Sequence, residues 1–209
     1  MVYWRLSACI LTVTVEDGVT NIGTYSFCDC NNLIQADLGD GIKAIGKNAF
    51  DRCSQLVNIS IPASTTLIDE LAFFECSALT DLLIPTNVKE LGDYAFSNCE
   101  SLQSVICKGN IRKIGSDCLS NCSSLTNVTF EGTVRDMGVA AFSGCTALQA
   151  IILPDAISSI RFLFQNCTSL ERVVLPDGMK QSRRIPDFAL LRFGFWNRGI
   201  HGRVLLHTR

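Results

Sequence analysis

The stretch Ile45–Pro62 reads I-G-K-N-A-F-D-R-C-S-Q-L-V-N-I-S-I-P, and this pattern returns along most of the 209-residue chain. Its cysteine recurs at steps of 23 residues, with a last step of 22. The periodic cysteines are Cys30, Cys53, Cys76, Cys99, Cys122, Cys145 and Cys167. A phenylalanine three residues before the cysteine and a leucine three residues after it keep the same step, except that Leu119 replaces the fifth phenylalanine. A fixed period of this length is typical of a solenoid of stacked repeats.

The repeat divides the chain into three parts. Residues 19–178 hold seven units of 22–24 residues, and residues 1–18 contain a partial repeat that supplies the end of a strand. Residues 179–209 leave the pattern and carry seven Lys and Arg residues against one aspartate, a net charge of +6, whereas residues 1–178 carry −8. We interpret residues 179–209 as a degenerate repeat, a C-terminal cap, or a non-native basic tail that arose from a frame change or a truncated gene.

Each unit combines two hydrophobic periods. Leu56, Ile59 and Ile61 predict a short strand that Pro62 ends, because alternate residues of a strand face opposite sides. Ala49, Phe50 and Cys53 follow at i, i+1 and i+4, a spacing that favours one or two turns of helix. Strands of neighbouring units would lie ~4.8 Å apart, whereas packed helical turns need ~8–10 Å. The sequence therefore predicts an α/β repeat solenoid that curves, with a parallel β-sheet on the concave side and short helical turns on the convex side.

The consensus I-G-x-x-A-F-x-x-C-x-x-L-x-x-I-x-I-P closely resembles the BspA-like subclass of leucine-rich repeats, over about residues 10–178. That family occurs in surface proteins of anaerobic bacteria and parasitic protists. The resemblance implies adhesion and binding of a protein or glycan ligand on the concave face, without catalysis, at the cell surface or after secretion.

An intracellular scaffold or regulatory interaction protein is the alternative. The short apolar run after Arg5 is needed as a strand and no small-residue cleavage site follows it, so no signal peptide is evident and a cytoplasmic location stays open. No apolar stretch approaches the ~18–20 residues of a transmembrane helix.

The chain contains eleven cysteines, an odd number, so at least one thiol is unpaired. We expect the seven periodic cysteines to form a structural ladder of buried thiols. On helical turns ~8–10 Å apart they would be too distant for disulfides, which need Cα atoms within ~7 Å, and too dispersed for a zinc site. Cys9, Cys28, Cys107 and Cys118 lie outside the ladder, and we interpret them as variants of the core.

Signals for catalysis and cofactors are absent from the repeats. Residues 19–178 contain no histidine, which removes the usual general base and the usual activator of a cysteine nucleophile. We therefore predict no catalytic residues, no cofactor and no metal. A whole-chain net charge of −2 argues against nucleic acid as the partner.

The candidate binding residues lie two and four positions after each repeat leucine, where strand alternation turns the side chain out of the core. They are Asp37, Asn58, Ser60, Asp81, Leu83, Ser104, Ile106, Asn127, Thr129, Ile152, Arg172 and Val174. The aliphatic members predict an apolar stripe that a protein partner could cover. Aliphatic residues also favour strands without any binding role, and the C-terminal segment could itself cover the stripe.

Four Asn-x-Ser/Thr sequences begin at Asn58, Asn121, Asn127 and Asn166. They are glycan acceptors only if a eukaryote secretes the protein, and Asn, Ser and Thr are common at these repeat positions in any case.

Overall fold

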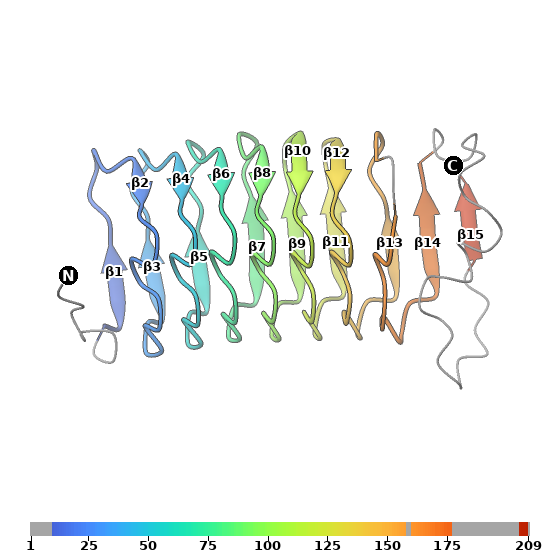
Figure 1. Ribbon diagram of the computed structural model, residues 1–209, viewed down its shortest axis with the longest axis horizontal. Helices are drawn as coiled ribbons and strands as arrows, with labels where there is room; N and C mark the ends of the chain where they lie inside the picture. The colour runs from blue at the N-terminus through green and yellow to red at the C-terminus, as the bar shows by residue number, and fades with distance from the viewer. Residues whose placement is uncertain (1–9, 158–159, 177–204, 209) are drawn as a thin grey trace.

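A computed structural model describes residues 10–157, 160–176 and 205–208, and it shows a parallel-strand β-solenoid of about seven turns, stacked in single file (Figure 1). Each turn of the solenoid, called a coil below, is one repeat. The interpretations of residues 1–9 and of most of the segment 179–209 concern residues outside this part of the chain. Strand β15 (Leu205–Thr208), which lies in that segment, pairs in parallel with the strand before it.

Two parallel sheets run along the solenoid. We call the first the long-strand sheet, and each coil contributes three or four residues to it. Its strands are β1 (Thr12–Thr14), β3 (Gln35–Asp37), β5 (Asn58–Ser60), β7 (Asp81–Ile84), β9 (Ser104–Cys107), β11 (Asn127–Phe130), β13 (Ala150–Ile152), β14 (Arg172–Leu175) and β15. The second, the short-strand sheet, consists of β2 (Asn21–Ile22), β4 (Ala44–Ile45), β6 (Leu67–Ile68), β8 (Glu90–Leu91), β10 (Ile111–Ile114) and β12 (Val134–Met137). Within the described residues, strands pair in parallel in both sheets.

The repeat period sets the register of both sheets. Gln35 lies opposite Asn58, and Asp81 lies opposite Ser104, each pair being one repeat apart in sequence. The long-strand sheet is divided into three hydrogen-bonded segments, β1-β3-β5, β7-β9-β11 and β13-β14-β15. The predicted parallel sheet is therefore present, but strand pairing is interrupted between β5 and β7 and between β11 and β13.

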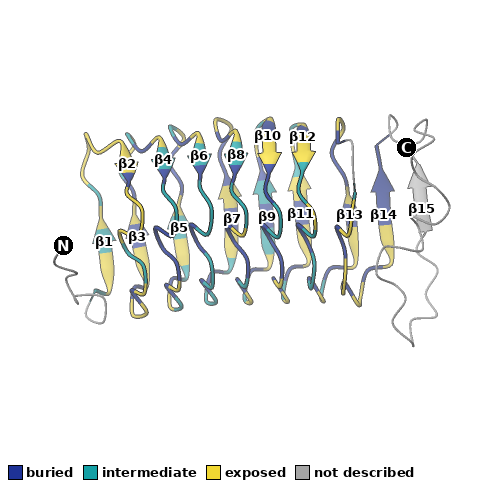
Figure 2. Cartoon of the chain, viewed as in Figure 1, coloured by how far each residue is buried: buried dark blue, intermediate teal, exposed yellow. Residues whose placement is uncertain are grey.

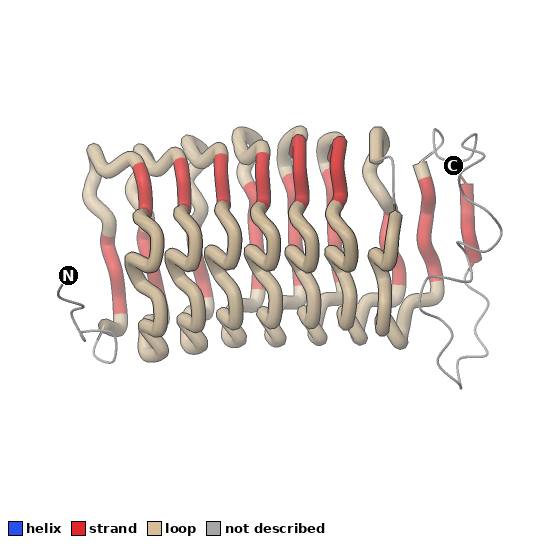
Figure 3. Tube along the Cα trace, viewed as in Figure 1, coloured by secondary structure: helices blue, strands red, loops and turns tan. Residues whose placement is uncertain are grey.

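The predicted helical turns are wrong, because the described residues contain no helix (Figure 3). In the segment 46–53 only alternate backbone N–H groups bond within the coil: that of Ala49 donates to Gly46, that of Asp51 to Asn48 and that of Cys53 to Phe50. Asn48, which lies between Gly46 and Ala49, has a φ of 54°, in the left-handed region. An α-helix cannot continue through a residue with this backbone conformation. A spacing of i, i+1, i+4 thus fits consecutive tight turns as well as a helix.

The remaining N–H groups of this segment join successive coils. Those of Phe50 and Arg52 donate to the carbonyl oxygens of Ala72 and Phe74 in the next coil, at 2.8 and 2.7 Å. Equivalent bonds recur from coil to coil as far as Gly144, which donates to Gln165 at 2.7 Å. The turn side is therefore spaced like a sheet and not like packed helices, so the argument for curvature from unequal spacing does not hold.

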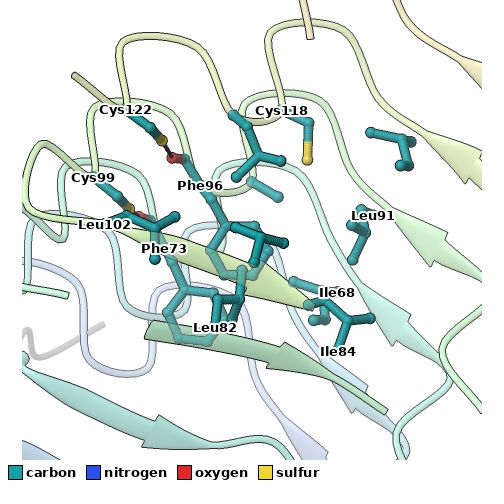
Figure 4. Packing of buried hydrophobic residues seen from close by; sticks show 14 of the residues in the cluster. Ile68, Phe73, Leu82, Ile84, Leu91, Phe96, Cys99, Leu102, Cys118 and Cys122 are labelled. Carbon is teal, nitrogen blue, oxygen red and sulfur yellow. Dashed lines mark hydrogen bonds between the residues drawn. The ribbon is translucent and has the colours of Figure 1, made fainter. Parts of the chain in front are cut away.

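The core follows this short repeat. Phe27, Phe50, Phe73 and Phe96 stack with ring centroids 5.1 Å apart, and the last three are fully buried. Figure 4 shows Phe73 and Phe96 packed beside buried aliphatic residues such as Leu82 and Leu102. Leu119 interrupts the aromatic stack, which resumes with Phe142 and Phe164 at 5.9 Å. The apolar layers thus run through successive coils, and no single repeat buries its own apolar faces.

Candidate binding face of the long-strand sheet

The outward side of the long-strand sheet brings the candidate binding residues into two rows. In the first row Asp81, Ser104 and Asn127 are successive strand partners, as are Ala150 and Arg172. In the second, Leu83, Ile106 and Thr129 are successive partners. Figure 2 shows exposed residues along these strands, and intermediate ones on β9. The side chains of these two rows therefore point out of the core, as strand alternation predicts.

The apolar stripe is shorter than the sequence predicts. Leu83 and Ile152 are 52% and 51% exposed, and Ile106 between them is partly exposed. Val174 is only 5% exposed, so it does not belong to the accessible surface. The accessible stripe therefore runs over β7, β9, β11 and β13, with Thr129 between Ile106 and Ile152.

A second apolar group was missed by sequence reasoning. Leu11 and Ile34 are 56% and 48% exposed, and Val57 beside them is partly exposed. The Ile34 N–H donates to the Leu11 carbonyl at 2.8 Å, and the Val57 N–H donates to Ile34 at 3.1 Å, so the three adjoin. The signal was available, because each follows the repeat leucine position directly, where later coils carry Thr, Gln or Glu.

The face carries few charges, and they are separated along it. Asp37 and Asp81 are exposed on β3 and β7, and Arg172 is exposed on β14. The Gln35 side-chain amide donates to both carboxylate oxygens of Asp37, at 3.0 and 2.9 Å. Asn58 and Asn127, which begin two of the Asn-x-Ser/Thr sequences, are exposed on this face. The other two, Asn121 and Asn166, are exposed on the turn side, where both have left-handed φ values of 58° and 61°.

A hollow opens on this face where the ladder changes between β11 and β13. Its volume is about 670 Å³. Asn127, Thr129, Ala150, Ile152 and Arg172 line it. Glu131 and Asp155 line it as well, so the hollow combines an aliphatic wall with charged groups of both signs, in line with the apolar stripe.

Comparison with known families identifies the repeat. The model of the BspA type leucine rich repeat region matches six copies, over residues 5–123 and 66–185. The chain belongs to the BspA-type leucine-rich repeat family. No curated protein matches the chain.

Two solved structures share the fold of this BspA-type chain, and a third is similar in sequence. A Treponema pallidum leucine-rich repeat protein is 24% identical, with 95% of this chain and 87% of that chain covered and a TM-score of 0.57. The pneumococcal vaccine antigen PcpA is 21% identical, with 81% and 37% covered and a TM-score of 0.50. A leucine-rich cell surface protein from Faecalibacterium prausnitzii is 27% identical, with 79% and 53% covered and a TM-score of 0.46. The chain thus spans about half the length of that last protein.

The periodic cysteines of the BspA-type repeat make hydrogen bonds that the sequence did not indicate. The Cys76 thiol donates to the Phe50 carbonyl at 3.2 Å, and Cys99 donates to Phe73 at 3.3 Å (Figure 4 shows the second). Equivalent bonds join Cys53 to Phe27, Cys122 to Phe96, Cys145 to Leu119 and Cys167 to Phe142. Each such thiol links two coils.

All ten cysteines in the described part of the chain are free. The distance argument against disulfides was wrong, because the turn side has the spacing of a sheet and not of helices. Burial raises the pKa of the Cys76, Cys99 and Cys122 thiols well above its ordinary value. A protonated thiol is a weak nucleophile, so these cysteines are unsuited to catalysis.

Cys28 is the most accessible of the described thiols, and it lies beside three charged groups. Its Sγ is 3.5 Å from an Asp29 oxygen and 3.7 Å from an Asp51 oxygen. Burial, followed by the charges of Asp51 and Asp29, raises the pKa of Cys28 to about 11. The Arg52 guanidinium binds Asp29 at 2.6 Å. The guanidinium also lies 3.8 Å from the Cys28 Sγ and lowers its pKa, but burial and the two carboxylates outweigh this effect, so Cys28 is not activated as a nucleophile.

Metal-ligating side chains are dispersed along the solenoid. No group of three or more His, Cys, Asp or Glu side chains in the described segments could hold a metal ion. Nor does any helix there have the length and apolar character needed to cross a membrane.

Proposed function

We propose that this BspA-type chain is a non-enzymatic protein-binding module that uses the outward face of the long-strand sheet. The observation that carries this proposal is the accessible stripe of Leu83, Ile106 and Ile152, which is flanked by polar residues such as Asp81, Ser104 and Asn127. Exposed apolar side chains within a polar rim are the composition of protein interfaces. Adhesion at a cell surface is the role that family membership favours.

The proposal is tested by charging the stripe. The double variant Ile106→Asp/Ile152→Asp places two carboxylates within the stripe, and burying them against a partner would be unfavourable. We expect it to lose proteins that the immobilised wild-type chain captures from its native environment, as quantified by mass spectrometry.

The matched control is Val139→Asp. Val139 is also aliphatic and 43% exposed, but it lies on the turn side. It should capture the same proteins as wild type, and circular dichroism should show that all three chains are folded. Equal capture by the double variant would refute the stripe as the binding surface.

An intracellular scaffold is the second candidate, and the ten free thiols favour it. Unpaired cysteines persist in reducing compartments, whereas oxidising compartments promote disulfides. Cell fractionation combined with a thiol count under non-reducing conditions separates the two locations. A surface fraction with all thiols intact would show that free cysteines do not require the cytoplasm.

A further inference from the structure

The stripe on the long-strand sheet has a repeat distance that distinguishes possible partners. Leu83, Ile106, Thr129 and Ile152 come from four successive coils, so the stripe runs along the solenoid axis, across the strands. Coils are spaced at roughly 4.8 Å by parallel strand pairing, and the stacked phenylalanine rings repeat at 5.1 Å. Any partner that follows the stripe must present side chains at nearly this interval.

An α-helix meets this requirement better than an extended strand does. Side chains on one face of a helix recur once per turn, at about 5.4 Å, whereas those on one face of a strand recur at roughly 6.6–6.8 Å. Over the three intervals from Leu83 to Ile152, a helix departs from the coil positions by roughly 2 Å and a strand by roughly 6 Å. A helix can therefore place one side chain per turn over each of the four coils.

The charges on the face complement a helix in one direction. Asp81 shares strand β7 with Leu83, at one end of the stripe. Arg172, on β14, lies one coil beyond Ile152 at the other end. The N-terminus of a helix carries partial positive charge and its C-terminus partial negative charge. The opposite charges of Asp81 and Arg172 therefore favour a helix with its N-terminus over Asp81 and its C-terminus over Arg172.

We propose that the partner segment is an amphipathic α-helix that lies along the solenoid axis over Leu83, Ile106, Thr129 and Ile152. This inference rests on the proposed function and specifies its ligand. Apolar side chains at i, i+4, i+7 and i+11 contact the four coils. A large side chain near the helix C-terminus enters the hollow of about 670 Å³ between β11 and β13, beside Thr129 and Ile152.

The test uses stapled peptides. The probe is an uncharged helix of about 16 residues, with capped ends, Leu at the four positions above, and Gln and Ala elsewhere. One comparator has the same composition with its leucines spread around the helix. The other is unstapled and alternates Leu with Gln as a strand would. Fluorescence polarisation gives the Kd of each for the full chain and for Ile152→Asp, Leu83→Asp and Val139→Asp.

We expect the patterned helix to bind most tightly, and its Kd to rise by roughly tenfold or more in Ile152→Asp and Leu83→Asp but not in Val139→Asp. A nitroxide on the peptide N-terminus should broaden the NMR signals of β7 residues more than those of β14. Tighter binding of the alternating peptide, an unchanged Kd in Ile152→Asp, or no binding of the helix would each overturn the inference. The proposed function would stand in those cases if Ile106→Asp/Ile152→Asp still lost the native partner.

Discussion

The thiol of Cys99 donates a hydrogen bond to the carbonyl oxygen of Phe73, 26 residues earlier in the chain, at 3.3 Å. The same oxygen accepts the backbone N–H of Cys76, also at 3.3 Å. Phe73 in turn stacks on Phe96, in the coil that contains Cys99. The periodic cysteine and the periodic phenylalanine thus act together, and they fix each tight turn to the coil before it.

Removing the thiol hydrogen bond at one coil has a predictable cost. Cys99→Ala deletes a donor and leaves a small cavity, so we expect the free energy of unfolding to fall by about 1–2 kcal/mol. The control is Cys107→Ala. Cys107 is 2% exposed, and among the described residues its thiol makes no hydrogen bond. Urea denaturation should show a smaller loss for Cys107→Ala, and equal losses would mean that the thiol hydrogen bond contributes nothing.

The buried thiols also predict a loss of stability in alkali. Burial raises the pKa of Cys107 from its ordinary value of 9.0 to about 12. Below pH 9 the thiol is protonated in the folded and unfolded states alike, and its contribution to stability is fully present. Between pH 9 and 12 only the unfolded state releases the proton, so stability falls by about 1.4 kcal/mol per pH unit for each such thiol.

The measurement is urea denaturation at pH 8, 9 and 10. We expect Cys107→Ala to have a shallower fall above pH 9 than wild type, because one ionising thiol is gone. The two chains should run parallel below pH 9. Parallel curves above pH 9 as well would contradict the buried, protonated state of this thiol.

Glycine at the corner before the tight turns allows coils to approach closely. A Cβ on Gly138 would overlap the backbone nitrogen of Ser116 and the carbonyl carbon of Gly115. We therefore expect Gly138→Ala to lower the free energy of unfolding by about 1–3 kcal/mol. Gly23 has the same repeat position, but there a Cβ would meet only the Ser26 hydroxyl, at 3.1 Å. Thermal melts should leave Gly23→Ala close to wild type, and similar shifts for both would refute the overlap.

The left-handed turn positions predict the opposite response to glycine. Glu75 has a φ of 56°, a conformation that costs a non-glycine residue roughly 1–2 kcal/mol. Glu75→Gly should raise the free energy of unfolding by about 0.5 kcal/mol after the entropy lost by glycine is included. Glu100→Gly, at a position without positive φ, should lower it by about 0.5–1 kcal/mol. Destabilisation of both by the same amount in urea would show that no strain is relieved.

The repeat period accounts for the register of the long-strand sheet, whereas the short-strand sheet and the tight turns were not predicted from the sequence. Equal spacing of Gln35 and Asn58 in successive repeats is enough to pair them, because parallel coils of constant length bring equivalent residues together. The left-handed residues Asn48 and Leu71 carried no such signal, since neither is glycine. Their conformation results from hydrogen bonding to the next coil, which is a property of the stack and not of one repeat.

The candidate face was predictable only in part for a similar reason. Alternation within a strand placed Leu83 and Ile152 outside, because it depends on two residues of the same strand. Val174 occupies the same repeat position but is buried. Its neighbouring strand β15 lies outside the regular repeats, so the repeat pattern could not predict this burial. The accessible patch of Leu11 and Ile34 was overlooked because strand alternation considers only the positions two and four after the repeat leucine, whereas these residues lie one position after it.

The division of the long-strand sheet between β11 and β13 has a mechanical consequence. Hydrogen bonds between coils point along the axis, so tension applied to the two ends of the solenoid loads successive junctions in series. When junctions between coils carry the same force, the weakest junction separates first. The junction between β11 and β13 lacks paired strands in the long-strand sheet. A ligand that contacts both Thr129 and Ile152 would connect the two coils at this junction, so the ligand-bound solenoid would need a higher force to unfold than the free one.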